Sequence, residues 1–502
     1  MLFAPFRAGL DLWMTAQFLA IDLGAESGRV MLGRLDGGVL SLSEVCRFPN
    51  DPIRQHGTLR WNIEALWGEI RRGLDRASGA RIESVGLDTW GCDYALLDDC
   101  GKLVETPYHY RDARTNGIPE TVWERVSFDR IYSITGIQHL VFNTLYQLYA
   151  ACQSTPEIID RARWFGTIPD LLNYWLTGEL RAEFTMATTT QFVDARTRDW
   201  ARELLEELDI PTRFLPEMIE PGAILGTVKT DVCAPLAGVP VVVPATHDTG
   251  SAAASVFGGG TTAFISSGTW SLFGTELQAP ITTPRARDLN FSNEGGVCGT
   301  TRLLKNIGGL WLLQACRRSW AAAGQDFDYT KLLNAASSNG HAFASLFDPD
   351  HHGFFQPPDM LEAISDYCRQ TSQRVPDGPA AFARGILESL AFKYRVVLES
   401  LEEIAGVRFE EIRIVGGGSR NRLLNQFTAD ATGRTVAAGP VEATALGNIA
   451  MQMLATGAVA SLDEARGIIE RSFPVERFEP RSTEAWNKHY RRFREYVEIT
   501  CV

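Results

Sequence analysis

Two similar glycine turns, one in each half of the chain, constrain the fold more than any other feature of the sequence. The first follows the apolar residues 18–21 and Asp22, contains Gly24 and Gly28, and leads into an extended run at 30–32. No polar residue interrupts the first run, which predicts a strand buried on both faces. Backbone N–H groups of such a turn can bind phosphate oxygens, and the carboxylate beside it can hold a divalent cation. The alternative is that Asp22 only caps the turn.

The second copy lies at residues 262–269 and has the same order of apolar strand, polar step and glycine turn. Asp22 and Ser266, like Gly24 and Gly268, are 244 residues apart in a chain of 502. This offset indicates a duplicated domain. Only the first copy carries the acid, as expected if two similar domains face one nucleotide and the first domain holds the metal.

A third glycine turn, residues 416–418, follows a predicted strand at 412–415 and leads into a predicted helix at 421–431. A strand followed by a glycine turn and a helix is typical of α/β folds, in which ligands bind at the carboxyl ends of strands.

The length of the chain predicts two domains, because 502 residues exceed what one hydrophobic core usually supports. Three consecutive glycines at 258–260 resist helix and strand, and they are the predicted hinge. We therefore expect an N-terminal domain at 14–257 and a C-terminal domain at 258–502. Met14 stands just before the first predicted strand, so residues 1–13 are interpreted as an extension or a misassigned start.

Composition excludes several classes of partner. The formal net charge of −13 argues against a nucleic-acid surface, which needs clustered Lys and Arg. The nine cysteines form no CxxC pair and have no histidine at metal-ligand spacing, which predicts reduced thiols in the cytoplasm. No run approaches the length of a membrane span, so no membrane partner is expected. A monomer or small homo-oligomer is predicted.

Polar residues follow a predicted strand at 82–87. This segment, residues 88–93, combines two aspartates, a threonine, Trp90, Gly91 and Cys92. Because it lies at the carboxyl end of a strand, it is a candidate wall of a substrate site. The alternative is a polar turn with a tryptophan that packs in the core.

A second polar segment follows the apolar, β-branched run at 239–244, which predicts a buried strand. The strand places His247 and Asp248 at its carboxyl edge, where a general base would be needed. There an aspartate can take a proton from a hydroxyl group as that oxygen attacks. The alternative is that Asp248 caps a helix that begins near Ser251.

These motifs together resemble the FGGY family of carbohydrate kinases. That family belongs to the class of actin, hexokinase and heat-shock chaperones, whose duplicated domains hold ATP in the cleft between them. Ten segments match in the same order across nearly the whole chain, and within the family they are most similar to the kinases of L-rhamnulose. The ten segments are residues 22–32, 86–98, 110–117, 136–148, 246–252, 266–272, 293–296, 304–314, 414–426 and 438–449.

The resemblance implies an α/β fold of two ribonuclease H-like domains with a central cleft, and it implies roles for particular residues. Asp248 matches the catalytic base. Gly91, His247 and Thr249 match positions that contact the sugar, and Asp248 also matches such a position. Asp22 matches a carboxylate associated with Mg²⁺. The residues matched to ATP binding or its surroundings are Ala25, Glu26, Ser27, Gly28, Arg29, Thr269, Asn306, Gln314 and Gly417.

Two departures from the family pattern are visible. Glu26 stands where a small hydroxyl residue is frequent, which puts a negative charge near the phosphate-binding turn. Some relatives pair two cysteines in the second half, but Gly385 stands where the partner of Cys368 is expected.

The activity implied by the resemblance is ATP-dependent and Mg²⁺-dependent phosphorylation of a ketose, with L-rhamnulose converted to L-rhamnulose 1-phosphate. L-Fuculose and xylulose are the alternative sugars, and an actin-like sugar sensor that binds ATP without transfer is the alternative of a different class. A dinucleotide-binding oxidoreductase would need G-x-G-x-x-G at the start of a helix, whereas the first turn leads into an extended run. A P-loop NTPase would need GxxxxGK[ST], which does not occur.

Overall fold

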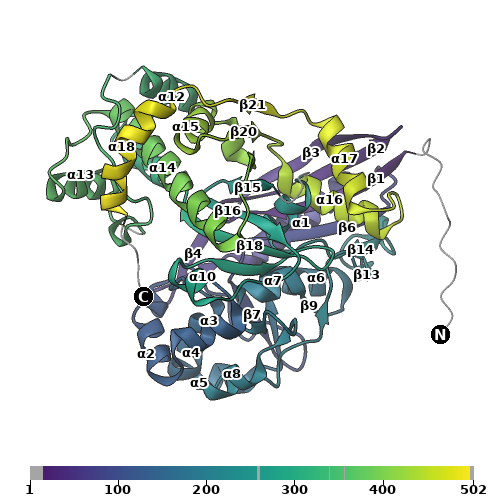
Figure 1. Ribbon diagram of the computed structural model, residues 1–502. Helices are drawn as coiled ribbons and strands as arrows, with labels where there is room; N and C mark the ends of the chain where they lie inside the picture. The colour runs from purple at the N-terminus through teal and green to yellow at the C-terminus, as the bar shows by residue number, and fades with distance from the viewer. Residues whose placement is uncertain (1–14, 257–260, 339, 356, 498–502) are drawn as a thin grey trace.

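Two mixed sheets, each built from one half of the chain, form the framework of the computed structural model (Figure 1). The structure describes residues 15–256, 261–338, 340–355 and 357–497. The strands of the first sheet are β1 (Ala16–Leu23), β2 (Ser27–Asp36), β3 (Val39–Pro49), β6 (Ser84–Thr89), β13 (Ile224–Thr227) and β14 (Pro240–Val242). Those of the second sheet are β15 (Thr262–Ser267), β16 (Trp270–Leu277), β17 (Ser292–Gly295), β18 (Thr301–Gly308), β19 (Glu411–Val415), β20 (Thr435–Ala438) and β21 (Glu476–Phe478).

The two sheets share one topology. The first has the order β13-β14-β6-β1-β2-β3 and the second β17-β18-β16-β15-β19-β20-β21. In each, a central strand, β1 or β15, begins an antiparallel series on one side, which is β1-β2-β3 in the first sheet and, with one strand more, β15-β16-β18-β17 in the second. On its other side the same strand begins a parallel series of three, through β6 and β14 or through β19 and β20. This repeat confirms the predicted duplication and the ribonuclease H-like α/β class.

Helices cover the faces of both sheets. Those of the first half are α1 (Ile63–Ala77), α2 (Ile118–Arg125), α3 (Phe128–Thr135), α4 (Thr144–Ser154), α5 (Pro156–Arg161), α6 (Ile168–Thr177), α7 (Phe184–Thr189), α8 (Arg202–Glu207) and α9 (Asp248–Ala254). Those of the second half are α10 (Pro284–Asp288), α11 (Trp311–Ala322), α12 (Tyr329–Ser337), α13 (Met360–Gln370), α14 (Pro379–Ala405), α15 (Arg422–Thr432), α16 (Ala443–Ala455), α17 (Leu462–Ser472) and α18 (Thr483–Tyr496). None of the helices within the described residues is long and apolar enough to cross a membrane.

Short strands pair outside the two main sheets. They are β4 (Pro52–Gln55), β5 (Thr58–Trp61), β7 (Tyr94–Leu97), β8 (Trp164–Thr167), β9 (Ala182–Glu183), β10 (Val193–Asp194), β11 (Asp199–Trp200) and β12 (Met218–Ile219). Strand β7 pairs antiparallel with β8, and β9 pairs parallel with β12.

Strand β1 is buried on both faces, as its unbroken apolar run predicts. Because side chains alternate along a strand, Phe18 and Leu19 face opposite sides of the sheet. Phe18 belongs to an apolar cluster with Ile449 of α16, whereas Leu19 belongs to a cluster with Leu74 of α1. One face of the first sheet is thus covered by a helix from the end of the chain.

Helices α16 and α17 lie by sequence in the proposed C-terminal domain, yet they pack against strands of the first sheet. Figure 1 shows these yellow-green helices beside the purple strands β1, β2 and β3. Helix α9, at the end of the first half, packs against α16. The two halves are therefore joined by this pair of helices, and the proposed hinge at 258–260 lies outside the described residues.

Candidate active site between the two sheets

A cavity of about 270 Å³ lies between the two sheets, and all three predicted glycine turns contribute to its lining. The turns meet because each follows the carboxyl end of a central strand, β1, β15 or β19. The predicted site residues that line this central cavity are Asp22, Ala25, Arg29, Gly91, His247, Asp248, Thr249, Thr269, Asn306 and Gly417.

Four predicted nucleotide-binding residues do not line the central cavity: Glu26, Ser27, Gly28 and Gln314. Gly28 packs inward, since a Cβ atom there would lie 2.7 Å from Leu23 Cδ2. Glu26 is exposed, and its Oε1 lies 3.8 Å from Arg318 Nη1. Ser27 supplies a carbonyl oxygen to the turn, and Gln314 Oε1 is buried without a hydrogen-bond donor among the described residues.

The first turn is closed by a hydrogen bond from Gly24 N to Ser27 O, 2.9 Å long. Asp22 and Arg29 stand opposite each other in the β1–β2 register, and Arg29 Nη2 lies 2.6 Å from Asp22 Oδ2. Arg29 also pairs with Glu442, which precedes α16. The guanidinium group is therefore held at the cavity wall by one carboxylate from each half of the chain.

The third turn approaches the second turn closely. A Cβ atom at Gly418 would lie 2.6 Å from Ser267 Cβ, so only glycine lets the two turns meet. At Gly417, which lines the cavity, a Cβ atom would meet nothing within 4 Å. The turn thus presents open backbone to a ligand, which is the property expected of a phosphate-binding surface.

Asp248 is the first residue of α9, and 32% of its side chain is exposed. Its Oδ1 accepts a hydrogen bond of 2.6 Å from Thr249 N. Burial raises the pKa of this carboxyl group, and the negative charge of Asp22 raises it further. A raised pKa makes Asp248 a better proton acceptor than an ordinary aspartate.

Asp88 is buried behind the cavity without lining it, and the sequence did not single it out individually. It pairs with Asp22 in the parallel β1–β6 register and is fully buried. Burial raises its pKa well above the usual range, with Asp22 adding to the effect. Asn448 Nδ2 of α16 donates to Asp88 Oδ2 at 2.6 Å. The strand end beside Asp22 is thus tied to a helix of the second half.

Aromatic side chains form an apolar wall of the cavity. The ring centroid of Phe142 lies 5.2 Å from that of Tyr110 and 5.8 Å from that of Trp270. Asp93 fixes this wall from behind, because its Oδ2 accepts hydrogen bonds from Trp90 Nε1 and from Tyr110 N. The predicted wall at residues 88–93 therefore contains both polar and apolar surface.

Asn306 joins the halves at the cavity. Its backbone N and its Nδ2 donate to Gln138 Oε1 at 2.8 and 3.1 Å. Gln138 also lines the cavity, and no property of the sequence marks it as a site residue. Its role depends on a contact between residues far apart in the chain.

The carboxylates of the cavity fit a hydrated magnesium ion. Within the described residues, no three His, Cys, Asp or Glu side chains are close enough to hold a metal by themselves. Mg²⁺ commonly keeps several waters and binds one or two carboxylates together with substrate phosphates. Asp22 lines the cavity and can provide one such carboxylate.

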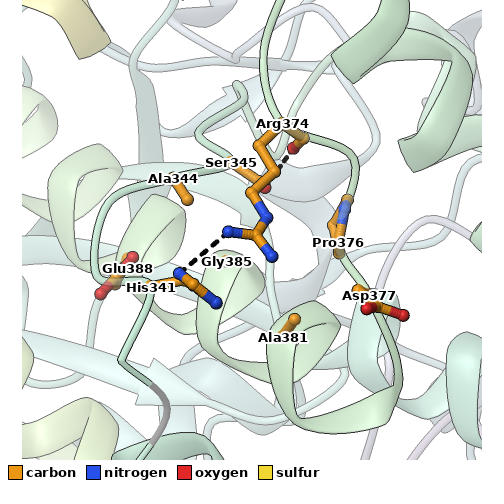
Figure 2. A pocket seen from close by; sticks show the side chains of 9 residues that line it. All are labelled: His341, Ala344, Ser345, Arg374, Pro376, Asp377, Ala381, Gly385 and Glu388. Carbon is orange, nitrogen blue, oxygen red and sulfur yellow. Dashed lines mark hydrogen bonds between the residues drawn. The ribbon is translucent and has the colours of Figure 1, made fainter.

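A second hollow, in the helical part of the second half, has a volume of only about 10 Å³. Figure 2 shows Arg374 over it, with Nη1 3.0 Å from His341 Nδ1. Gly385 lies here, where a Cβ atom would be 2.9 Å from Ser345 O. Cys368 is a buried free thiol, as are the other buried cysteines among the described residues. A space of one water cannot hold a substrate.

Models of a known protein family match both halves of the chain that form the cavity. The N-terminal domain model of the FGGY family of carbohydrate kinases matches residues 17–258, and the C-terminal domain model matches 263–456. The chain is 43% identical to the rhamnulokinase of Bacteroides thetaiotaomicron over 489 residues, which are 96% of this chain and 100% of that protein.

Two solved structures show the same fold at low sequence identity. Gluconate kinase from Lactobacillus acidophilus has a TM-score of 0.79 and 16% identity, and the match covers 96% of this chain and 97% of that one. Plasmodium falciparum glycerol kinase, solved with ADP, has a TM-score of 0.76 and 17% identity, with 97% and 99% covered. The chain belongs to the FGGY family of carbohydrate kinases.

Proposed function

We propose that this chain transfers the γ-phosphoryl group of ATP to the C1 hydroxyl of a ketose, with L-rhamnulose as the sugar and L-rhamnulose 1-phosphate as the product. The name of the relative from B. thetaiotaomicron, at 43% identity, supports this substrate. The observation that carries the proposal is the position of Asp248 in one cavity with three glycine turns. A base and a phosphate-binding surface are what phosphoryl transfer to a hydroxyl needs. A sugar sensor would need no base.

The glycine turns are the proposed binding surface for the phosphates of ATP. Ala25, Thr269 and Gly417 line the cavity, one from each turn. Their backbone amides would neutralise charge that develops on the transferred group. We propose that Arg29, held between Asp22 and Glu442, adds a fixed positive charge to this surface.

The proposed metal site is Asp22. Its Oδ2 is used by Arg29, which leaves Oδ1 for a metal-bound water or for Mg²⁺ itself. Mg²⁺ bound there would neutralise charge on the phosphate oxygens. The scattered cysteines support a cytoplasmic location, and a monomeric or small homo-oligomeric state stays a prediction.

Asp248 is the proposed general base. Its carboxylate would accept the proton of the C1 hydroxyl as that oxygen attacks phosphorus, and its raised pKa favours this transfer. His247 and Thr249 flank it and line the same cavity, so we propose that they orient the sugar hydroxyls.

The apolar wall supports a 6-deoxy sugar as the substrate. L-Rhamnulose carries a methyl group at C6 where L-fructose carries a hydroxymethyl group. Tyr110, Phe142 and Trp270 offer no unpaired donor or acceptor on their ring faces, so a buried hydroxyl against them would lose its hydrogen bonds to water.

We expect kcat/KM for L-rhamnulose to exceed that for L-fructose by about 10- to 100-fold, because an apolar pocket discriminates against one added hydroxyl to about this extent. An assay of ADP release with L-rhamnulose, L-fructose, L-fuculose and xylulose measures the ratio. Release of ADP with none of these ketoses would refute the proposed transfer and favour a sugar sensor. Equal kcat/KM values for L-rhamnulose and L-fructose would refute the proposed role of the apolar wall but not the proposed phosphoryl transfer.

Replacing Asp22 with Asn is expected to raise the Mg²⁺ concentration for half-maximal activity by about 10-fold or more, because a weaker ligand replaces a carboxylate. KM for the ketose should change less than about threefold. The measurement is a Mg²⁺ titration of activity, with Mn²⁺ binding in the presence of ADP followed by electron paramagnetic resonance. Unchanged metal dependence in both assays would remove Asp22 from the metal site.

A further inference from the structure

Glu183 carries a buried carboxyl group that the proposed mechanism does not use. Its side chain is fully buried at the N-cap of α7, where its oxygens accept hydrogen bonds from Thr185 N at 2.8 Å and from Met186 N at 3.2 Å. The residues that usually cap a helix are Ser, Thr, Asp and Asn, whose shorter side chains reach the same amides. The greater length of Glu183 therefore needs an explanation other than capping.

The same carboxyl group contacts Thr246, which lies two residues before the proposed base Asp248. Thr246 N donates to Glu183 Oε2 at 3.0 Å, and Thr246 Oγ1 donates to the same oxygen at 2.7 Å. Thr246 is fully buried, and neither Glu183 nor Thr246 lines the central cavity. One side chain thus joins the start of α7 to the segment that carries the base, without touching the space for the substrates.

This contact takes the place of a strand pairing. Strand β14 ends at Val242, so Thr246 lies beyond its regular pairing with β6 and β13. Thr246 O still accepts from Thr89 N at 2.8 Å, but Thr246 N donates to Glu183 instead of to a strand. A buried N–H group without an acceptor costs free energy, so the carboxyl group stabilises this course of the backbone.

Helix α7 is a firm anchor for such a contact. All six of its residues are buried, and Thr188 Oγ1 accepts a hydrogen bond of 2.8 Å from Gly295 N of β17 in the second sheet. At its start, Glu183 N donates to Asp170 Oδ1 at 3.1 Å. The helix is therefore held by contacts with both halves of the chain, and Glu183 transmits its position to Thr246.

We propose that Glu183 is a positioning residue for catalysis: its carboxyl group fixes Thr246 and thereby holds Asp248 in place for the attacking hydroxyl group. The inference deepens the proposed function and rests on it for its kinetic consequences. A base must stay within hydrogen-bond reach of the proton that it takes. A misplacement of about 1 Å can lower the rate about 100-fold.

The kinetic test is Glu183→Asp. Aspartate can still cap α7, but it is one methylene group shorter and withdraws from Thr246. We expect kcat for L-rhamnulose to fall about 10-fold or more, with KM for ATP within about twofold. The matched control is Glu388→Asp, since Glu388 is also buried and accepts from Phe343 N at 2.7 Å, but lies at the second hollow (Figure 2). It should keep kcat within about twofold. Equal kcat losses in the two variants, or wild-type kcat in Glu183→Asp, would overturn the inference.

Variants of Thr246 separate positioning from a merely structural role. Thr246→Val keeps the shape but loses the hydroxyl donor, and we expect kcat to fall about threefold or more. Thr246→Ser should recover most of this loss, because it restores the donor. The control for a lost buried hydroxyl is Thr428→Val on α15, where Oγ1 donates to Leu424 O at 2.8 Å, and its kcat should stay within about twofold. Combining Glu183→Asp with Thr246→Val should cost less than the product of the two losses, since both remove one contact. Full additivity would contradict the inference.

Hydrogen–deuterium exchange tests the contact without reference to activity. In Glu183→Asp, we expect amide exchange in the peptide of residues 240–252 to accelerate about 10-fold or more, while α7 keeps its wild-type exchange because it is still capped. The same peptide should be unchanged in Glu388→Asp. Wild-type exchange of this peptide in Glu183→Asp would refute the anchoring of Thr246. Failure of every ketose to release ADP would refute the proposed function, while the exchange measurement still decides whether Glu183 holds this segment.

Discussion

Replacing Asp248 with Asn is expected to lower kcat for ketose phosphorylation by about 100- to 10,000-fold, the range that general-base catalysis supplies. Asparagine keeps the size of the side chain but cannot take the proton of the attacking hydroxyl. The affinity for ATP should stay within about twofold, because the glycine turns that would bind the phosphates are separate from α9. ADP release measures kcat, and calorimetric titration measures ATP binding.

A matched control for this variant is Asp430→Asn. Asp430 is buried on α15, does not line the central cavity, and accepts a hydrogen bond of 2.6 Å from Arg481 N. We expect its kcat to stay within about twofold of the wild-type value. If Asp248→Asn lost ATP binding and kcat by equal factors, Asp248 would have a structural role instead of a catalytic one.

The sequence predicts the framework of the site well, because the framework depends on local patterns. A strand with buried apolar residues is followed by a glycine turn at β1, β15 and β19, and the turns after these strands all line the cavity. Parallel strands bring their carboxyl ends to one edge of a sheet, so turns far apart in sequence converge there. The same rule places Asp248 after β14, beside them.

Individual glycines are harder to interpret, since a glycine is needed both for close packing and for ligand binding. Gly28 matches a phosphate-binding position, but it packs against Leu23 and does not line the cavity. Gly417 matches another and has open space beside it. Both residues are glycines in the sequence, and only their neighbours in the folded structure show which one packs and which one is open to a ligand.

Contacts between the halves cannot be predicted from local pattern. The hydrogen bond from Asn448 to Asp88 joins residues 360 positions apart, and the Glu294–His247 contact joins a strand of the second sheet to the segment that follows β14 of the first. In the sequence, Asn448 is one polar residue in an apolar helix. Its partner is fixed only when α16 packs on the first sheet, so the polar network behind the site required the structure.

The crossing of α9 and α16 joins the halves at Gly447. A Cβ atom there would lie 2.6 Å from the carbonyl carbon of Ser251, which is backbone and cannot rotate away as a side chain can. Helix α9 begins with Asp248, and α16 carries Asn448, which holds Asp88. The spacing of the two helices therefore sets the relative positions of the proposed base and the end of strand β6.

Replacing Gly447 with Val is expected to lower the free energy of unfolding by about 3 kcal/mol, because overpacking at a backbone contact forces the helices apart. The activity of the folded fraction should also fall, since Asp248 moves with α9. Thermal and denaturant unfolding measure the loss. The control is Gly68→Ala on α1, where a Cβ atom meets nothing within 4 Å, and this change should stabilise the protein by about 0.5–1 kcal/mol through helix propensity. Wild-type stability in Gly447→Val would mean that α9 and α16 do not need close contact.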